Sequence, residues 1–116
     1  MYKKEELKLK MAIVRSMIFL DDRTKNIKKS YKYALQKDLY DAYAELLRLC
    51  IYANRSHGSK KTYQNKMDTQ LEIIRSFVDM AVDPHMRLIS PGLHKMWSNE
   101  LNQIGCLLGA WIKATK

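Results

Sequence analysis

The sequence predicts an all-α fold, an up-down-up-down four-helix bundle, from two observations about its 116 residues. Apolar residues recur at three- and four-residue steps in four separate blocks, the spacing of one apolar stripe along a helix. Only four glycines and two prolines occur, and neither Asn-Gly nor Asp-Gly is present, which favours long helices over hairpins. Four such stripes joined by short turns are typical of a bundle, and the length suits a single domain over residues 1–116.

The first two predicted helices end at polar stretches. The first carries its apolar row at Leu7, Met11, Val14 and Ile18, and it ends at residues 21–24. The second ends at residues 54–59, where Gly58 supplies a stop and Ser59 or Thr62 could cap the next helix. The apolar row of the second helix consists of Leu35, Leu39, Ala42, Leu46, Leu49 and Ala53.

The last two predicted helices are separated by two proline signals. The third helix breaks at Asp83-Pro84, and Ser90-Pro91 announces the fourth with an N-cap followed by proline at the first helical position. The row of the third helix is Met67, Leu71, Ile74, Val78 and Ala81. The row of the fourth is Leu93, Trp97, Leu101, Ile104 and Leu108, continued by Trp111 or Ile112.

Two of these helices carry apolar residues beside their main rows. Leu47 and Ile51 lie off the main row of the second helix, and Ile73, Phe77 and Met80 form another stripe on the third. One bundle seam cannot easily bury both stripes, and surplus apolar strips usually mark a partner surface. We therefore expect self-association.

The last helix also contains two glycines on one face, Gly105 and Gly109, beside Trp111. Each glycine costs about 1 kcal/mol of helix propensity relative to alanine. The missing side chains would let another backbone approach closely, either at a helix crossing inside the core or between subunits. All three residues are expected to contribute to packing or to the oligomer.

No catalytic constellation can be assembled from this chain, so we expect a binding protein that is not an enzyme and needs no cofactor. His57, His85 and His94 fall in or near predicted turns, and no Cys or His stands at metal-binding spacing. Cys50 and Cys106 are expected to be small buried residues with free thiols, in keeping with a reducing cytosol. There is no run of eighteen apolar residues, so no membrane span is expected.

The charge is strongly basic, at +9 from 21 Lys+Arg and 12 Asp+Glu. Such a field favours polyanions and above all nucleic acid, although charge kept only for solubility is the alternative. Lysines outnumber arginines, which favours point-charge contacts to phosphate over base recognition. In an up-down bundle, one end would gather Arg23, Lys25, Lys28, Lys29, Lys32 and Arg87. The opposite end would gather Lys3, Lys4, Arg55, Lys60, Lys61, Lys66, Lys113 and Lys116.

Three segments in register carry a resemblance to a known family. Residues 100–113, ELNQIGCLLGAWIK, resemble the ending E-I-G-R-x-L-G-G-W-I-K of accessory variability determinant proteins of diversity-generating retroelements. Residues 30–35, SYKYAL, are similar to the family's R-Y-x-L segment, and residues 71–75, LEIIR, to its L-E-x-L-R segment. The chain departs from the pattern at Gln103 and Cys106, where the family usually has glutamate and arginine.

The resemblance implies a four-helix bundle that assembles into a homopentameric ring. It also implies a bacterial or phage-encoded cytoplasmic accessory that binds a reverse transcriptase and RNA or DNA and supports mutagenic cDNA synthesis. Two alternatives stay open. One is a bundle protein encoded by a 23S ribosomal RNA intervening sequence, without a reverse-transcriptase partner. The other is a structural helical interaction module.

Overall fold

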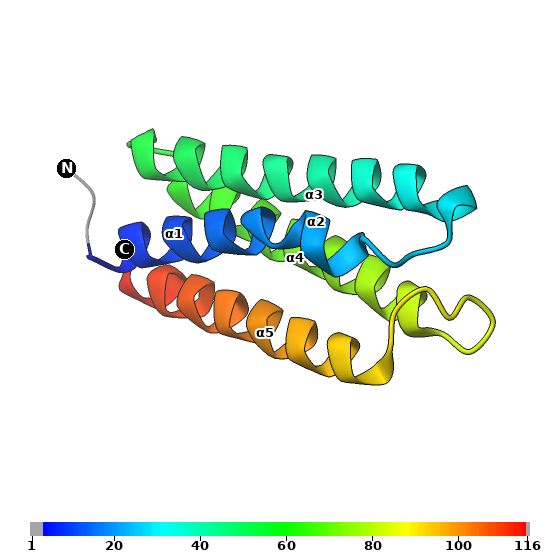
Figure 1. The fold of residues 1–116 in the computed structure, drawn as a ribbon. Helices are drawn as coiled ribbons and strands as arrows, with labels where there is room; N and C mark the ends of the chain where they lie inside the picture. The colour runs from blue at the N-terminus through cyan, green and yellow to red at the C-terminus, as the bar shows by residue number, and fades with distance from the viewer. Residues whose placement is uncertain (1–3, 116) are drawn as a thin grey trace.

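The computed structural model describes residues 4–115. Four long helices alternate in direction along the bundle, and a fifth, short helix extends the first (Figure 1). They are α1 (Lys4–Ile18), α2 (Leu20–Thr24), α3 (Lys29–Arg55), α4 (Lys60–Val82) and α5 (Pro91–Ala114). The predicted all-α bundle is therefore confirmed.

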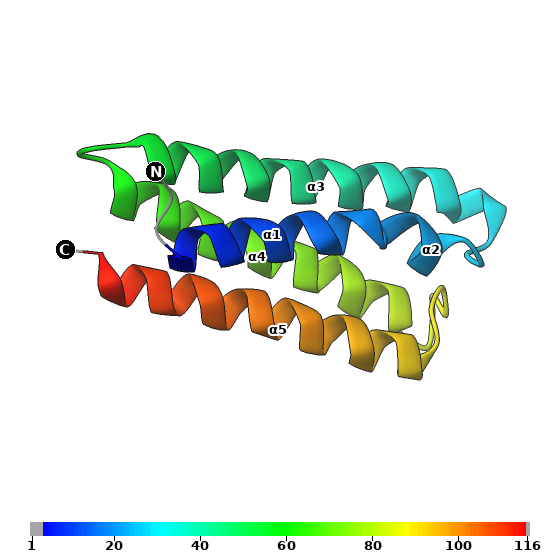
Figure 2. The ribbon, with the colours of Figure 1, turned by 60° about the vertical axis from the view of Figure 1, so that its left-hand side comes forward.

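The helices occupy the four corners of an elongated bundle measuring 44 × 22 × 20 Å. α1 packs against α3 and α5, and α4 packs against the same two helices, so α1 and α4 stand at opposite corners (Figures 1 and 2). Both α1 and α4 run in the same direction along the bundle. The α2–α3 turn and the α4–α5 loop meet at one end, and the α3–α4 turn lies at the other.

The core rows predicted for the second and third helices are confirmed, because every residue in them is buried in α3 and α4. In α5 the row is buried from Trp97 to Trp111, whereas Leu93 at its start and Ile112 are only half-buried. These rows alone fill most of one hydrophobic cluster that runs through the bundle. The rows predicted from helical spacing are the buried ones here, because each row is the most apolar face of its helix.

The row predicted for the first helix is wrong. Leu7, Met11 and Ile18 are 45%, 53% and 69% exposed, and the buried face consists of Glu6, Leu9, Ile13, Ser16 and Leu20. Both rows have helical spacing, and the exposed one is the more apolar. The mixed row is buried because its polar members have partners: Ser16 Oγ lies 2.6 Å from Tyr43 Oη, and Glu6 Oε1 accepts from Trp111 Nε1 at 3.1 Å.

The first helix also continues past its predicted end. α1 breaks only at Phe19, whose N–H donates to the Arg15 carbonyl, and α2 then runs through the polar stretch to Thr24. Thr24 is buried, and its hydroxyl donates to the Leu20 carbonyl at 2.9 Å. α1 and α2 together form one side of the bundle.

The predicted start of the last helix is confirmed, but the caps around the α3–α4 turn differ from expectation. Ser90 Oγ accepts from the Leu93 N–H at 3.1 Å, and Pro91 is the first residue of α5. Ser59 precedes α4, but its hydroxyl makes no capping hydrogen bond. Instead, Ser56 Oγ accepts from the Ser59 N–H at 2.8 Å, and Gly58 does not adopt a positive φ.

The two glycines of α5 have different surroundings. A Cβ on Gly105 would lie 2.6 Å from Arg75 Nη2 and 3.5 Å from Leu71 Cδ2, both on α4. The space at Gly105 is therefore filled by an arginine side chain, which corrects the expectation of a close backbone approach. A Cβ on Gly109 would meet no atom within 4 Å.

We predict opposite effects of substitution at these glycines. Gly109→Ala should stabilise the fold by about 1 kcal/mol, because it adds helix propensity in open space. Gly105→Leu should destabilise it by about 1–3 kcal/mol, because the larger side chain must displace Arg75 and press on Leu71. Urea unfolding of each variant measures both changes. A loss of stability in Gly109→Ala would contradict the open face around Gly109.

Candidate nucleic-acid interface

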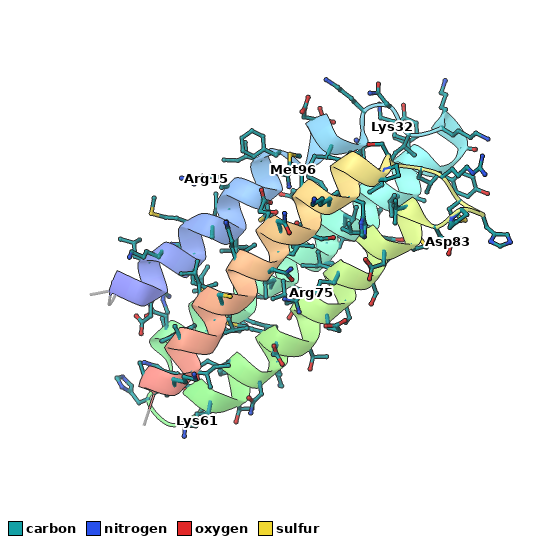
Figure 3. All side chains as sticks on the ribbon, turned by 90° about the horizontal axis from the view of Figure 1, so that it is seen from below. Arg15, Lys32, Lys61, Arg75, Asp83 and Met96 are labelled. Carbon is teal, nitrogen blue, oxygen red and sulfur yellow. The ribbon has the colours of Figure 1, made fainter. Side chains whose placement is uncertain are left out.

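The predicted basic end is formed by two connections that lie side by side. Lys25 and Lys28 lie in the α2–α3 turn, Lys29 begins α3, and Arg87 lies in the α4–α5 loop. Asn26 from the turn and Arg87 from the loop line the same cavity, of about 330 Å³. Figure 3 shows Lys32 at this end of the molecule, together with Asp83. We call Lys28, Lys29, Lys32 and Arg87 the turn cluster.

The lysines of the turn cluster are poorly neutralised. Within the described residues, Lys28, Lys29 and Lys32 have no carboxylate at ion-pair distance, and the first turn of α3 contains no acid. The N-terminus of α3 adds its own partial positive charge. Several cations thus gather where a helix already favours an anion, an arrangement that phosphate would relieve.

Lys25 and Arg87 have local partners. Lys25 Nζ lies 2.9 Å from Asp22, and the hydrogen bond together with the carboxylate charge raises the pKa of Lys25. Arg87 adopts a φ of 48°, and its Nε donates to the Pro84 carbonyl at 3.0 Å. Lys25 is therefore partly neutralised, whereas the exposed Arg87 is held to its loop by hydrogen bonds to the Pro84 and Asp83 carbonyls.

Arg23 lines the same cavity as Arg87, but its guanidinium is already paired with Glu100, which corrects its assignment as a phosphate contact. Its side chain is only 7% exposed, and its two terminal nitrogens donate to the Glu100 carboxylate at 2.7 and 2.6 Å. The guanidinium also lies 5.5 Å from the ring centroid of Trp97. The hydrogen bonds and charge of Glu100 raise the pKa of Arg23. Arg23 therefore ties α2 to α5.

A buried polar network surrounds this ion pair, and sequence reasoning missed it. Trp97 Nε1 donates to Tyr43 Oη at 2.9 Å, and Tyr43 Oη also bonds with Ser16 Oγ. Burial raises the pKa of Tyr43. Tyr43, which sits between the predicted row residues of α3, is fully buried. No local pattern could have signalled the network, because its members are far apart in sequence.

The opposite end carries a second, separate basic surface, and Lys3 and Lys116, also expected there, lie outside the described residues. Arg55 and Lys61 are exposed there, and Figure 3 shows Lys61 far from Lys32. Lys60 is less available, because its Nζ lies 3.6 Å from the buried Glu6 carboxylate. The two predicted clusters are thus placed at the two ends of a bundle 44 Å long and do not form one patch.

The residues predicted for packing or oligomerisation have different environments. Trp111 is 2% exposed and belongs to the core of its own chain. Leu47 and Phe77 are partly buried against the core, and Ile51 is half-buried. Ile73, at 42% exposed, is the most accessible of the apolar side chains in this set.

Among the described residues there is no cluster of three or more His, Cys, Asp or Glu side chains that could hold a metal ion. Cys50 is buried, and burial raises its pKa to about 11. Cys106 is exposed, which corrects the expectation that both thiols are buried. None of the helices in residues 4–115 is long and apolar enough to cross a membrane.

Fold and surface together define a small, basic, all-α bundle protein with cations at both ends. A family model described as bAvd-like matches residues 8–115, and the chain belongs to this family. The resemblance to accessory variability determinant proteins is thereby confirmed. No match was found among curated proteins or among solved structures.

Proposed function

We propose that this protein is a non-catalytic, oligomeric accessory of a reverse transcriptase in a diversity-generating retroelement, and that it binds RNA or DNA through phosphate contacts. Its membership of the bAvd-like family supports the retroelement role. The observation that carries the binding role is the turn cluster, where unneutralised lysines meet the N-terminus of α3. In this role the protein acts in the cytoplasm and supports mutagenic cDNA synthesis.

Binding proceeds by charge rather than by base recognition. Lysine is a compact point charge that contacts phosphate without a fixed fork of donors. Such contacts hold the nucleic acid in place and carry no sequence information. Five copies of the +9 chain in a homopentamer would carry +45, a field that attracts a polyanion from a distance. Weak contacts on separate copies would then add through avidity.

Replacing Lys28, Lys29 and Lys32 with glutamine should weaken RNA and DNA binding together, by about tenfold or more at physiological salt. Each lost phosphate contact also lowers the slope of log K against log salt by about one. The three side chains lie outside the core, so helicity and assembly should be unchanged. Fluorescence anisotropy with labelled single-stranded RNA and duplex DNA, measured from 50 to 300 mM salt, tests this expectation.

The matched control is the triple glutamine variant of Arg55, Lys61 and Lys113 at the opposite end, which removes the same three charges. If the control loses as much affinity as the turn-cluster variant, net charge rather than a site governs binding. If only the control loses affinity, the interface lies at the α3–α4 end. Co-purification with a reverse transcriptase encoded beside the gene for this protein tests the proposed partner.

A further inference from the structure

The outward face of α1 is an apolar stripe with bases along its flank, and the exposed Asp21 and Asp22 lie just beyond its C-terminal end. Leu7, Met11 and Ile18 are exposed along it, and Val14 lies between them. Between Leu7 and Leu20 every charged residue is basic, and Lys8 and Arg15 are both exposed. We call Leu7, Met11, Val14 and Ile18 the α1 stripe. Within the described residues, no other segment buries this stripe.

The opposite corner of the bundle carries a complementary surface on α4. Ile73, Phe77 and Met80 form the apolar floor of a shallow groove of about 380 Å³, which Thr69, Glu72 and Ser76 complete. We call these six residues the α4 groove. Its border is acidic, since Glu72 and Asp79 are each 69% exposed. Glu72 reaches Arg75 only at 3.4 Å, and Asp79 bonds His94, so both carboxylates still face solvent.

The two surfaces match in length and in charge spacing. Leu7 to Ile18 and Thr69 to Met80 each span eleven helical steps, or about 16 Å. Lys8 and Arg15 are seven residues apart, as are Glu72 and Asp79. Facing helices could therefore pair both charges at once.

The position of the charges also sets the direction of packing. Lys8 and Arg15 each follow a residue of the α1 stripe, whereas Glu72 and Asp79 each precede a residue of the α4 groove. One step along a helix turns about 100°, so the bases and the acids flank their apolar rows on opposite sides. When two helices face each other in parallel, these opposite sides meet, whereas antiparallel packing would separate them.

We propose that the α1 stripe of one copy packs, in parallel, into the α4 groove of the next copy. This inference rests on the self-association that forms part of the proposed function, and it names the surfaces that carry it. Because α1 and α4 stand at opposite corners, each copy offers one surface to each of two neighbours. The contact is heterologous, so it propagates and can close into a ring. Parallel packing aligns the long axes of neighbouring bundles and therefore places the turn clusters of all copies at the same end of the assembly.

Two variants that each block one surface test the contact. Met11→Glu places a carboxylate on the α1 stripe against the acidic groove, and Ile73→Glu places one in the α4 groove. Both positions are exposed, so each variant should keep its helicity but sediment as a single 13.7 kDa chain. Mixed in equal amounts, they should form a heterodimer, in which the intact α1 stripe of the Ile73→Glu chain packs into the intact α4 groove of the Met11→Glu chain. Assembly should stop at two chains, because the two surfaces left free are the substituted ones.

The control and the other outcomes separate this inference from the function it rests on. Met96→Glu alters an equally exposed methionine on α5 and should leave the oligomer intact. A parent protein that is monomeric at micromolar concentration would overturn self-association itself. If the parent is oligomeric and either variant stays so, self-association stands and these surfaces are wrong. If the variants are monomeric but do not combine on mixing, the heterologous contact is wrong.

Charge reversal tests the parallel direction and remains informative if an apolar substitution disturbs folding. Lys8→Glu with Arg15→Glu should weaken assembly at least tenfold, measured by analytical ultracentrifugation. Adding Glu72→Lys and Asp79→Lys to the same chain restores the net charge of the parent and should restore assembly. Failure of the fourfold variant to recover would overturn parallel pairing.

Discussion

Replacing Glu100 with alanine is expected to lower the free energy of unfolding by about 3 kcal/mol, the low end of the cost of removing one partner from a buried ion pair, because the Glu100 side chain is 25% exposed. The Arg23 side chain is 7% exposed, and both of its terminal nitrogens donate to Glu100. Without that carboxylate, the guanidinium would stay desolvated and unpaired beside Trp97. Urea unfolding at a fixed protein concentration measures the loss.

A surface ion pair provides the control. Arg48 pairs with Glu45 three residues away on α3, where the two side chains are 53% and 42% exposed. Glu45→Ala should therefore cost less than about 1 kcal/mol. Equal losses for Glu45→Ala and Glu100→Ala would contradict a structural role of the buried pair.

The same pair makes stability depend on pH. Burial by itself raises the pKa of Glu100, but the hydrogen bonds from Arg23 and Ser16 and the charge of Arg23 outweigh burial, so the pKa falls below its ordinary 4.5. The stabilisation is therefore fully present above that value and is lost as the pH falls through the lower pKa of the folded state. Glu100→Gln should flatten the fall in stability below pH 4.5. An unchanged acid profile would show that other carboxylates govern it.

Truncation of Trp111 to alanine is expected to cost about 3–5 kcal/mol, because a large, fully buried side chain would leave a cavity. Trp111 is 2% exposed, and its indole N–H also donates a hydrogen bond to the Glu6 carboxylate. Trp111→Phe should keep most of the packing but leave the buried Glu6 without that donor, at a cost of about 1–3 kcal/mol. Chemical denaturation of both variants gives the two values.

The protein-concentration dependence of unfolding separates core packing from assembly. Because Trp111 is buried within one chain, its loss should destabilise that chain by the same amount at every protein concentration. Met96→Ala, at an exposed methionine of the same helix, should cost well under 1 kcal/mol and serves as the control. A Trp111→Ala defect that vanishes at high protein concentration would place this side chain in an interface instead.

The sequence was sufficient to predict the buried faces of three of the four long helices, because in these helices the row with helical spacing is also the most apolar one. Each predicted row in α3, α4 and α5 is the most apolar stripe of its helix, and the Ser90-Pro91 start follows from local cap chemistry. The two basic ends were also predictable. Alternating helices joined by short turns necessarily bring the α2–α3 turn and the α4–α5 loop to the same end.

Arg23 and Gly105 were misinterpreted for a common reason. Both belong to pairs between distant segments, Arg23 with Glu100 and Gly105 with Arg75. A basic residue in a cationic stretch is expected on the surface, and a glycine inside a helix is expected where another backbone approaches closely. Neither pattern shows which distant residue the position will contact. The identity of each partner depends on how the helices are rotated about their own axes.

A basic all-α bundle with cations at both ends could be predicted without coordinates, because the helical spacing of apolar residues and the charge are local properties of the chain. The buried face of α1, by contrast, depends on contacts with the other helices. That helix offers two rows, one purely apolar and one containing Glu6 and Ser16. The second is buried because Trp111 and Tyr43, on other helices, satisfy its polar atoms, so the more apolar row is left on the surface.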